Sequence, residues 1–241
     1  MKLVEFNSNI PEENIALDEM LLQKAEADGI GESLRFWESR THFVVLGRSG
    51  KIKEDCFPDK CESGGIKIIR RISGGGTVLQ GEGCLNYSLV LSYEKVPEYT
   101  DINASYRKIL SKMIEQFRTR GQEVEFMPIS DLAIQGKKIS GNAQARKKKF
   151  FLHHGTFLYD FDLGLISEYL RHPGKEPDYR QNRSHKDFVD NIPLIRTELE
   201  DAVKEVFGPD EEIYIPSDED IQKMRELVRT RYSDKGWNYA F

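Results

Sequence analysis

The most informative stretch of this sequence is Arg70-Arg71-Ile72-Ser73-Gly74-Gly75-Gly76-Thr77. Three consecutive glycines remove every Cβ, so the backbone can approach a ligand closely and turn its amide groups toward anionic oxygens. The two preceding arginines can bind a phosphate or carboxylate group through paired hydrogen bonds. A tight turn with two exposed charges is the simpler interpretation of a glycine triplet taken alone. The stretch matches neither a P-loop, which ends in Gly-Lys-Ser/Thr, nor the GxGxxG turn of dinucleotide-binding proteins.

Hydrophobic periodicity on both sides of this stretch predicts interleaved strands and helices. Helices are expected at residues 14–26, 106–117, 195–207 and 219–231, with Asn14 as the cap of the first and Gly208 ending the third. Strands are expected at residues 34–37, 43–46, 66–69, 84–93, 124–127, 132–134 and 150–159. Because the order has no steady strand–helix–strand rhythm, we expect an α+β or layered α/β fold, with a mixed β-sheet packed against helices.

The bulk composition limits the class of protein. The chain has 241 residues, of which 31% are charged and 39% hydrophobic, and its net charge is −5. These values suit one large soluble domain, or one domain with a small appendage, and give no general attraction for nucleic acid. No apolar run is long enough to span a bilayer, and the N-terminus lacks the apolar core of a signal peptide. We therefore expect a cytoplasmic protein that binds neither nucleic acid nor a membrane.

The three cysteines are Cys56, Cys61 and Cys84, an odd number without a CxxC pair. With no secretory signal, this count argues against a disulfide framework. The sequence near Cys56 and Cys61 supplies no partners with which they could ligate a metal. Reduced thiols that bind no metal are therefore expected at these two positions.

A second stretch of interest runs from residue 130 to residue 144 and contains Asp131 and Lys138. A lysine held between glycines at a strand edge can enter a site as a point charge and stabilise a transferring phosphoryl group. An aspartate can hold Mg²⁺ through a hard oxygen, the usual way in which that ion meets a nucleotide site. Taken alone, the stretch fits a polar hairpin with solvated lysines equally well.

Three further polar segments are candidates for contact with a ligand or a partner. Adjacent histidines on a strand point to opposite faces, so at most one of His153 and His154 lines a site, and His154 beside Gly155 is the better candidate. Residues 177–185 are rich in aromatic and planar donor groups and could face a substrate. The basic run 146–149 is typical of a solvated hairpin tip, or else of a dock for an acidic protein domain.

Together these segments resemble the lipoate-protein ligase A family, within the wider biotin/lipoate ligase superfamily. Residues 70–77 match the family pattern RRxSGGGxV, residues 83–88 are similar to GNxNxS, and residues 136–144 are similar to GxKxxGxAQ. Residues 153–156 match HHGT, and residues 14–22 are similar to the opening-helix pattern NxAxDExL. The order and spacing of these segments agree over about the first 195 residues, and their co-occurrence is far more specific than any one motif.

The resemblance implies an ATP-dependent lipoate-protein ligase. The carboxylate of lipoate attacks the α-phosphate of ATP to give lipoyl-AMP, and a lysine amine of a lipoyl-domain carrier protein then takes the acyl group. Lys138 matches the family's essential lysine, whose charge stabilises both developing anions, and Asp131 matches its magnesium-associated aspartate. The residues that match the family's contacts with lipoate (or octanoate) and the adenylate are Arg71, Ser73, Gly74, Gly75, Gly76, Thr77, Asn86, Ser140, Gly141, His154 and Gly155.

The same resemblance predicts one catalytic domain of the biotin/lipoate ligase type over residues 1–241, with residues 209–241 as a short C-terminal helical extension. The candidate boundary at residues 208–217 contains two prolines and an acidic cluster, and the segment after it is too short for an independent domain. The accessory domain of long family members is expected to be absent. Full ligation is therefore expected to need a separate accessory protein or a different docking mode.

Two positions depart from the family pattern. Gln80-Gly81 stand where the family usually has His-Asp, and Cys84 replaces the first asparagine of GNxNxS. Nucleotide contacts at these two positions are therefore left open by the sequence.

Two other functions stay open on the same fold. An octanoyl- or lipoyltransferase would form a thioester on cysteine without ATP. Cysteine-dependent relatives have that thiol shortly before the lysine motif, where residues 123–127 contain none, so Cys84 would have to serve. The other alternative is a non-catalytic lipoate-binding protein, against which Lys138 and Arg71 argue. A biotin ligase is disfavoured because its GRGRxGR loop is not the sequence at residues 70–77.

Overall fold

The computed structural model describes residues 1–209 and 213–241. Within these residues, eight strands form a mixed sheet in the order β11-β1-β2-β6-β10-β9-β8-β7. These strands are β1 (Lys2–Val4), β2 (Ser33–Trp37), β6 (Cys84–Ser92), β7 (Val124–Met127), β8 (Asp131–Ile134), β9 (Lys137–Arg146), β10 (Phe150–Leu158) and β11 (Ile213–Tyr214). Strand β1 lies parallel to β2 and β11, whereas the other neighbouring pairs are antiparallel.

A smaller sheet in the described part of the chain has the order β4-β3-β5. Its strands are β3 (Phe43–Leu46), β4 (Lys67–Arg70) and β5 (Val78–Gln80). Strand β3 lies parallel to β4 and antiparallel to β5. Because β4 ends at Arg70 and β5 begins at Val78, the glycine-rich stretch is the connection between these two strands.

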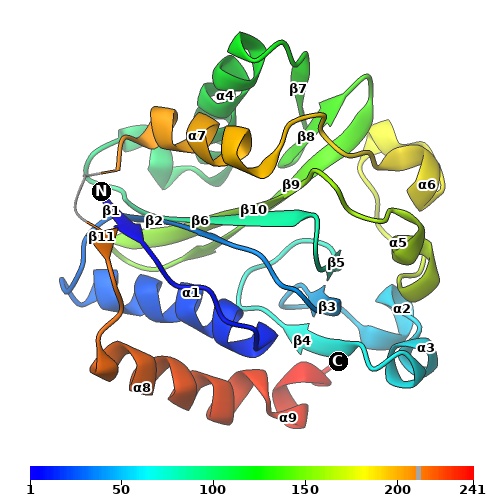
Figure 1. The fold of residues 1–241 in the computed structure, drawn as a ribbon, viewed down its shortest axis with the longest axis horizontal. Helices are drawn as coiled ribbons and strands as arrows, with labels where there is room; N and C mark the ends of the chain where they lie inside the picture. Colours follow the sequence, from blue (N-terminus) through cyan, green and yellow to red (C-terminus); the bar gives the residue numbers. More distant parts are fainter. Residues whose placement is uncertain (210–212) are drawn as a thin grey trace.

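Helices cover both faces of the large sheet (Figure 1). The described helices are α1 (Pro11–Glu26), α2 (Ile52–Asp55), α3 (Pro58–Ser63), α4 (Ile102–Thr119), α5 (Gly164–Tyr169), α6 (His185–Phe188), α7 (Arg196–Phe207), α8 (Asp218–Leu227) and α9 (Lys235–Asn238), with 3₁₀ turns η1 (Pro97–Thr100) and η2 (Asp178–Arg180) and a π-helical turn η3 (Val228–Tyr232). Helices α4 and α7 lie over one face, and α1 lies over the other with α8 outside it (Figure 1). In residues 1–209 and 213–241, no helix is both long and apolar enough to cross a bilayer.

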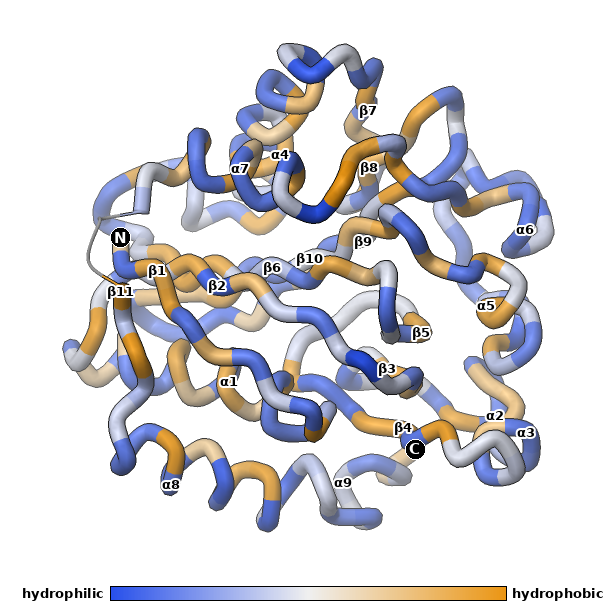
Figure 2. Tube along the Cα trace, in the orientation of Figure 1, coloured by the Kyte–Doolittle hydropathy of each residue, from blue (hydrophilic) through white to orange (hydrophobic). Residues whose placement is uncertain are grey.

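Three hydrophobic clusters hold these layers together. The first lies between the large sheet and α4 and α7, and the second lies between the opposite face of the sheet and α1 and α8. The third surrounds the small sheet and the short helices α2, α3, α5 and α6. The tube of α8 alternates between apolar and polar segments (Figure 2), as expected for a helix with one apolar face on α1.

The expected mixed sheet packed with helices is confirmed. The predicted strands at residues 43–46 and 124–127 have the observed bounds, and the other predicted strands differ from the observed ones by one residue at one or both ends. The helix expected at 106–117 is longer, because the Asp101 side chain caps its start by accepting a hydrogen bond of 2.6 Å from the amide of Ala104. Gly208 ends α7 in the left-handed conformation with φ of 50°.

The prediction of Asn14 as a helix cap is wrong. Helix α1 begins at Pro11, after Ile10, and Asn14 lies inside its first turns. The Asn14 side chain is buried, and its hydrogen bonds connect α1 to the preceding loop at Ser8 and to strand β2 at Arg35. Its Oδ1 accepts hydrogen bonds from the Ser8 amide at 3.1 Å and from Arg35 at 2.7 Å, and its Nδ2 donates to the Ser8 carbonyl at 2.7 Å.

Strand β9 was missed from the sequence, where its residues fit a polar hairpin. Its polar and small residues, among them Ser140, Gly141 and Asn142, hide the alternation that predicts a strand. These residues form a strand because β9 pairs with β10 on one side and with β8 on the other.

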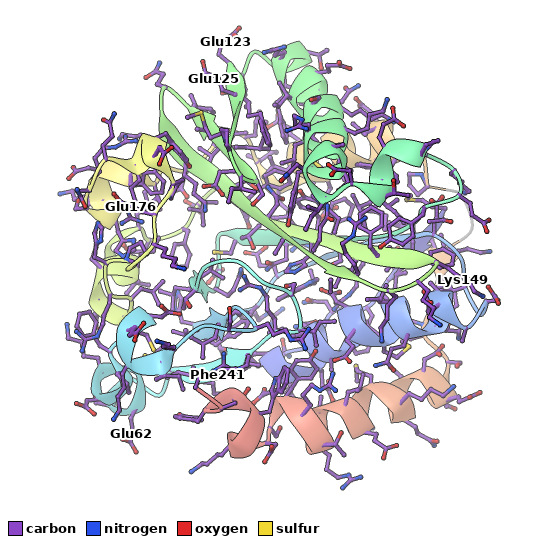
Figure 3. The ribbon with its side chains drawn as sticks, turned by 180° about the vertical axis from the view of Figure 1, so that it is seen from behind. Glu62, Glu123, Glu125, Lys149, Glu176 and Phe241 are labelled. Atoms are coloured by element: carbon purple, nitrogen blue, oxygen red, sulfur yellow. The ribbon has the colours of Figure 1, made fainter. Side chains whose placement is uncertain are left out.

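The run 146–149 forms the tip between β9 and β10, where Lys149 pairs with Asp28 at 2.6 Å. Figure 3 shows Lys149 at the edge of the molecule, beside the end of α1.

Residues 213–241 pack onto the rest of the chain through both sheets. Strand β11 extends the large sheet beside β1, α8 packs on α1, and α9 contacts β4. The helix expected at 219–231 is present as α8 followed by the π-helical turn η3. Of the candidate boundary at 208–217, residues 210–212 lie outside the described residues.

Candidate active site

A pocket lies between α1, the small sheet and strands β6 and β8 to β10 of the large sheet. Eleven of the residues that the sequence singled out line it: Arg71, Ser73, Gly75, Gly76, Thr77, Asn86, Asp131, Lys138, Gly141, His154 and Gly155. The structure therefore brings together four sequence segments that lie up to 84 residues apart, from Arg71 to Gly155. Two predicted site residues, Gly74 and Ser140, are not among the lining residues.

The glycine-rich connection is organised from within by Arg71. The buried Arg71 guanidinium donates to the carbonyls of Gly74 at 2.5 Å and Gly76 at 2.9 Å, and to Ser73 Oγ at 3.0 Å. Burial lowers the pKa of Arg71 to about 10, so the group is still a cation at neutral pH. These bonds place a positive charge directly against the loop and hold the carbonyls of Gly74 and Gly76 toward Arg71.

Close backbone approaches at this loop explain two of the glycines. Gly75 has φ of +89°, a conformation that L side chains rarely adopt. A Cβ on Gly47 would lie 2.0 Å from the Gly75 carbonyl oxygen, so the loop can pack against the end of β3 only because residue 47 has no side chain.

Arg70 does not reach the pocket, contrary to the expectation that both arginines bind the ligand. Its fully buried guanidinium donates to the carbonyl of Gly50 at 2.6 Å and to those of Trp237 and Asn238 at 3.0 Å each. Successive residues at the end of a strand point to opposite sides. Arg71 consequently faces the pocket, while Arg70 fastens the C-terminal segment to β4.

Ser73 and His154 join the loop to the large sheet. Ser73 Oγ and His154 Nε2 share a hydrogen bond of 2.6 Å. Burial and the nearby charge of Arg71 lower the pKa of His154 well below its usual value, which keeps the imidazole neutral. His153 points to the other face, where it packs between Tyr87 and Tyr106, and burial lowers its pKa to about 3.

Lys138 and Asp131 form an ion pair on adjacent strands, with Nζ 2.8 Å from Oδ1. Both side chains line the pocket, and that of Lys138 is 27% exposed. A Cβ on Gly141 would lie 2.8 Å from Nζ of Lys138, so the lysine occupies space that this glycine leaves free.

A bulge in the β8–β9 ladder places Lys138 in the pocket and Ser140 outside it. The register shifts between Leu132 and Ala133, so that Leu132 pairs with Ser140 and Ala133 with Lys138. A bulge re-aims the side chains that follow it. Ser140 Oγ is buried without a hydrogen-bond partner in the described structure. The expectation that Ser140 contacts the ligand therefore stays a prediction that the geometry does not favour.

The segment 177–185 reaches the site through one residue, Tyr179. Its hydroxyl donates to Asp131 Oδ2 at 2.8 Å. Burial, followed by the charge of Asp131, raises the pKa of Tyr179 above its usual value. Both carboxylate oxygens of Asp131 thus have partners, one in Lys138 and the other in Tyr179.

Asn86 belongs to a closed ring of three polar side chains at the pocket wall. Gln80 Nε2 donates to Thr156 Oγ1 at 2.7 Å, Thr156 donates to Asn86 Oδ1 at 2.6 Å, and Asn86 Nδ2 donates to Gln80 Oε1 at 2.9 Å. Within the ring each member donates once and accepts once, and Asn86 Nδ2 donates in addition to the Cys84 carbonyl at 3.3 Å, which fixes the orientation of both amides. Gln80, where the sequence departs from the family pattern, is therefore a pocket residue.

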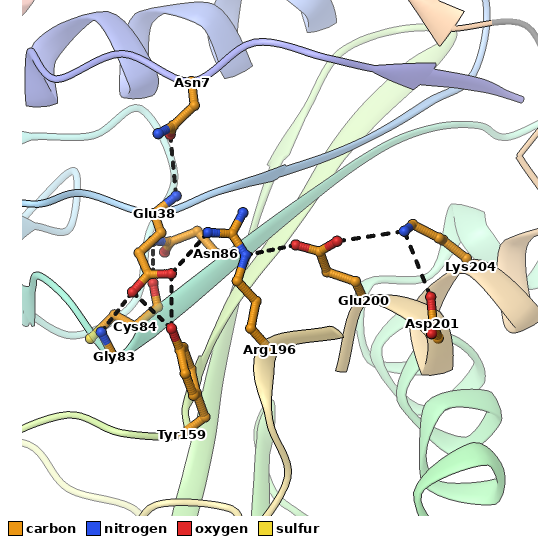
Figure 4. A network of polar contacts seen from close by, with 10 residues as sticks. All are labelled: Asn7, Glu38, Gly83, Cys84, Asn86, Tyr159, Arg196, Glu200, Asp201 and Lys204. Carbon is orange, nitrogen blue, oxygen red and sulfur yellow. Dashed lines mark hydrogen bonds and ion pairs between the residues drawn. The ribbon is translucent and has the colours of Figure 1, made fainter. Parts of the chain in front are cut away.

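Glu38 anchors the turn that precedes Asn86 (Figure 4). Its carboxylate accepts hydrogen bonds from the Gly83 amide at 2.7 Å and from the Tyr159 hydroxyl at 3.0 Å, and pairs with Arg196 at 3.2 Å. This network fixes the start of β6 from behind the pocket.

The cysteines have no access to the pocket. Cys56, Cys61 and Cys84 are free and buried, and no described lining residue is a cysteine. The Sγ of Cys84 points to the Leu79 carbonyl at 3.9 Å. Burial raises the pKa of Cys84 well above its usual value and that of Cys56 to about 12, so both groups are protonated thiols at neutral pH.

Part of the pocket lining is apolar and was not identified from the sequence. Five of these side chains belong to the hydrophobic cluster under α1, namely Ile15, Trp37, Val45, Leu152 and Tyr232. They come from five different elements, and an apolar residue in a strand or helix looks the same in sequence whether it faces a core or a cavity. Only the assembled fold distinguishes the two.

Comparisons with known proteins agree with this fold. The model of the family described as Lipoyl protein ligase A/B catalytic domain matches residues 10–207. The octanoyltransferase LipM of Brevibacillus brevis is 25% identical over 261 residues, which cover 95% of this chain and 94% of that protein. Lipoate–protein ligase 1 of Staphylococcus aureus is 27% identical over 252 residues, which cover 100% of this chain and 74% of that ligase. A structure from the archaeal lipoylation system of Thermoplasma acidophilum, described as a bi-partite lipoate protein ligase and its E2 lipoyl domain, superposes with a TM-score of 0.83 at 24% identity, over 99% of this chain and 95% of that one.

Proposed function

The chain belongs to the family of lipoyl protein ligase A/B catalytic domains, and from this starting point we propose that it is an ATP-dependent lipoate-protein ligase. It joins the carboxylate of lipoate, or of octanoate, to AMP and transfers the acyl group to a lysine of a lipoyl-domain carrier protein. The observation that supports this most directly is Lys138, a cation held by Asp131 in the same pocket as the loop of Arg71.

The proposed chemistry has two steps, and both take place where the carboxylate of the acid meets the α-phosphate of the nucleotide. In the first, a carboxylate oxygen of the acid bonds to the α-phosphorus of ATP, and pyrophosphate leaves. In the second, the carrier amine bonds to the acyl carbon, AMP leaves, and the amine loses a proton. Both steps increase negative charge on oxygens at the acyl-phosphate junction, and a cation already fixed in position stabilises that charge without reorganisation.

The loop and the histidine have binding roles in this proposal. The backbone amides near Gly75 and Gly76 offer donors to anionic oxygens, with the Arg71 charge behind them. His154 is held neutral, so it adds no charge of its own and instead fixes Ser73 through their hydrogen bond.

Mg²⁺ is expected to arrive with ATP, because this ion is held largely by phosphate and water oxygens. Asp131 is the pocket carboxylate beside Lys138 that could ligate it. Lys138 contacts one oxygen of Asp131 and Tyr179 the other, and each oxygen keeps a further lone pair with which it could ligate the ion. Neither of the steps above depends on the ion.

A transferase that needs no ATP is the second candidate, and the octanoyltransferase of Brevibacillus brevis favours it. Such an enzyme needs a thiol that can become a thiolate in the pocket. Cys84 is buried, protonated and not among the lining residues, which disfavours this candidate.

The deciding experiment measures pyrophosphate release from the purified chain with Mg-ATP, with and without lipoate. We expect release that depends on lipoate and is lost in Lys138→Ala. Lys137→Ala is the matched control, because Lys137 precedes it on β9 but pairs with Asp190 at 3.1 Å and does not line the pocket. No release in the wild type, with acyl transfer from an acyl-carrier donor that fails in Cys84→Ala, would make the chain a transferase.

The need for an accessory protein stays a proposal, supported by the bi-partite relative from Thermoplasma acidophilum. We expect the 241-residue chain to form lipoyl-AMP by itself and to transfer the acyl group slowly to a lipoyl domain. Rapid transfer by the chain alone, measured by the mass shift of the lipoyl domain, would contradict a required partner.

A further inference from the structure

The turn that precedes Asp131 presents an exposed isoleucine at the edge of the pocket. We propose that this residue, Ile129, is a docking contact for the lipoyl-domain carrier while the carrier's lysine enters the pocket. The proposal rests on the proposed function, because it concerns the protein that receives the acyl group in the second step.

Exposure falls along four successive residues that lead from the surface into the pocket. Pro128 and Ile129 are exposed, Ser130 is half-buried and Asp131 is buried. Ser130 and Asp131 line the pocket, whereas Pro128 and Ile129 do not. Ile129 therefore lies at the rim of the pocket, and the chain keeps its Cα within about 8 Å of the Cα of Asp131.

A single exposed isoleucine is not unusual, and Ile129 is singled out by its position. Eight large apolar residues of the described part of the chain are exposed, and Ile129, at 70%, is the one that directly precedes a pocket residue. Covering Ile129 with a partner would remove apolar surface from water beside the site of acyl transfer, which favours association there.

The turn that carries Ile129 is fixed to strand β9. Ser130 Oγ donates to the Asn142 carbonyl at 2.7 Å, and Asn142 Nδ2 donates to the Ser130 carbonyl at 2.7 Å. Asn142 Oδ1 in turn accepts a hydrogen bond from the buried Tyr87 hydroxyl. A contact that is already held in one position loses less conformational entropy when a partner binds.

The second step of the proposed reaction brings another protein to this rim. The carrier amine has to meet the acyl carbon beside Lys138, whose side chain is 27% exposed and whose Nζ lies 2.8 Å from Asp131 Oδ1. Since a lysine side chain extends about 6 Å from its Cα, the carrier's backbone has to come within about 10 Å of the Asp131 carboxylate. A folded domain at that distance meets the surface that contains Ile129.

The test separates docking of the carrier from the chemistry. Three reactions are measured for the wild type and for Ile129→Ser: pyrophosphate release with lipoate, capture of lipoyl-AMP by hydroxylamine, and acylation of an unmodified lipoyl domain. Hydroxylamine attacks the same acyl carbon and releases AMP, but it is too small to contact the rim. We expect kcat/KM for the lipoyl domain to fall about tenfold in Ile129→Ser, with the other two reactions unchanged within about twofold.

Ile195→Ser is the matched control. Ile195 is 64% exposed and directly precedes α7, on the face of the large sheet opposite α1 (Figure 1). This variant should acylate the lipoyl domain within about twofold of the wild-type rate. Ile129→Leu keeps the apolar surface and should also stay within about twofold of the wild type, whereas Ile129→Thr replaces the serine variant if that variant does not fold.

Binding measured without turnover completes the test. NMR titration of an isotope-labelled lipoyl domain should give a Kd about tenfold weaker with Ile129→Ser than with the wild type. A kcat/KM for the lipoyl domain within twofold of the wild type overturns the inference alone. Equal losses in carrier acylation and in hydroxylamine capture also overturn it, because the substitution then acts inside the pocket.

The remaining outcomes distinguish the inference from the proposed function. A wild type that binds the lipoyl domain but releases no pyrophosphate overturns the proposed ligase and leaves the effect of Ile129→Ser on binding measurable. A wild type to which the lipoyl domain does not bind overturns the docking contact, whatever its pyrophosphate release. A dimer in solution that Ile129→Ser dissociates would assign the side chain to a contact between copies of this chain and overturn the inference as well.

Discussion

The ammonium group of Lys138 occupies the space beside Gly141 in which a side chain would otherwise lie, with Nζ 2.8 Å from the position of a Cβ there. Gly141→Ala should therefore displace Lys138 while leaving its charge in the protein. Misplacing a reacting group by about 1 Å can cost on the order of 100-fold in rate.

We expect Gly141→Ala to lower lipoate-dependent pyrophosphate release about 10- to 100-fold, with a melting temperature near that of the wild type. Gly174→Ala is the control, since a Cβ at that exposed loop position meets no atom within 4 Å. Equal activity of the two variants would show that the position of Lys138 is not critical.

Arg70 and Arg71 should respond differently to the same substitution. Arg70→Lys removes a planar group that serves several buried carbonyls, and we expect a loss of about 2–4 kcal/mol in unfolding free energy. Arg71→Lys should mainly lower activity, because Arg71 shapes the loop that lines the pocket. Urea unfolding and pyrophosphate release, measured on both variants, separate the two roles, and a larger loss of stability in Arg71→Lys would contradict the assignment.

His153 should make the fold sensitive to acid. Burial lowers its pKa from 6.5 to about 3, so below pH 6.5 the unfolded chain binds a proton that the folded chain excludes. Its stabilising contribution is complete above pH 6.5 and declines as the pH falls from there toward 3, by up to about 1.4 kcal/mol per pH unit. The unfolding free energy of His153→Gln, measured by urea titration from pH 7.5 to 5, should fall less steeply than that of the wild type. Parallel profiles would refute this contribution.

The Glu38 network can be tested by removing its charge. Glu38→Gln places an amide donor against the donors of Gly83, Tyr159 or Arg196, which should cost about 1–3 kcal/mol. Because the Arg196 side chain is 44% exposed, solvent screens the lost charge pair and most of the cost comes from the unmatched hydrogen bond. Glu205→Gln, at an exposed ion pair with Arg120, should cost less than about 0.5 kcal/mol in the same chemical unfolding experiment.

Residues whose function depends on a local backbone shape could be found from the sequence. The glycine triplet and the opposite orientations of His153 and His154 follow from spacing within one segment. The bulge between Leu132 and Ala133, which decides that Ser140 faces away, depends on the pairing of two strands and leaves no clear signal in either.

Residues whose function depends on distant partners could not be found in this way. Arg70 and Tyr232 look like an ordinary charge and an ordinary aromatic residue until the chain is folded, because their partners lie 168 and 213 residues away. Strand β9 escaped detection for a related reason. Its stability comes from two neighbouring strands rather than from its own apolar pattern.

The contacts of Glu19 with Arg231 and Tyr232 span 212 and 213 residues of chain. During synthesis, α1 is made early, and its partners leave the ribosome only after nearly all the rest of the chain. Contacts that close such long loops form slowly and late. A nascent chain with α1 and the glycine-rich loop already emerged therefore still lacks Tyr232, one of the residues that line the pocket, so the pocket is complete only after translation has passed residue 232.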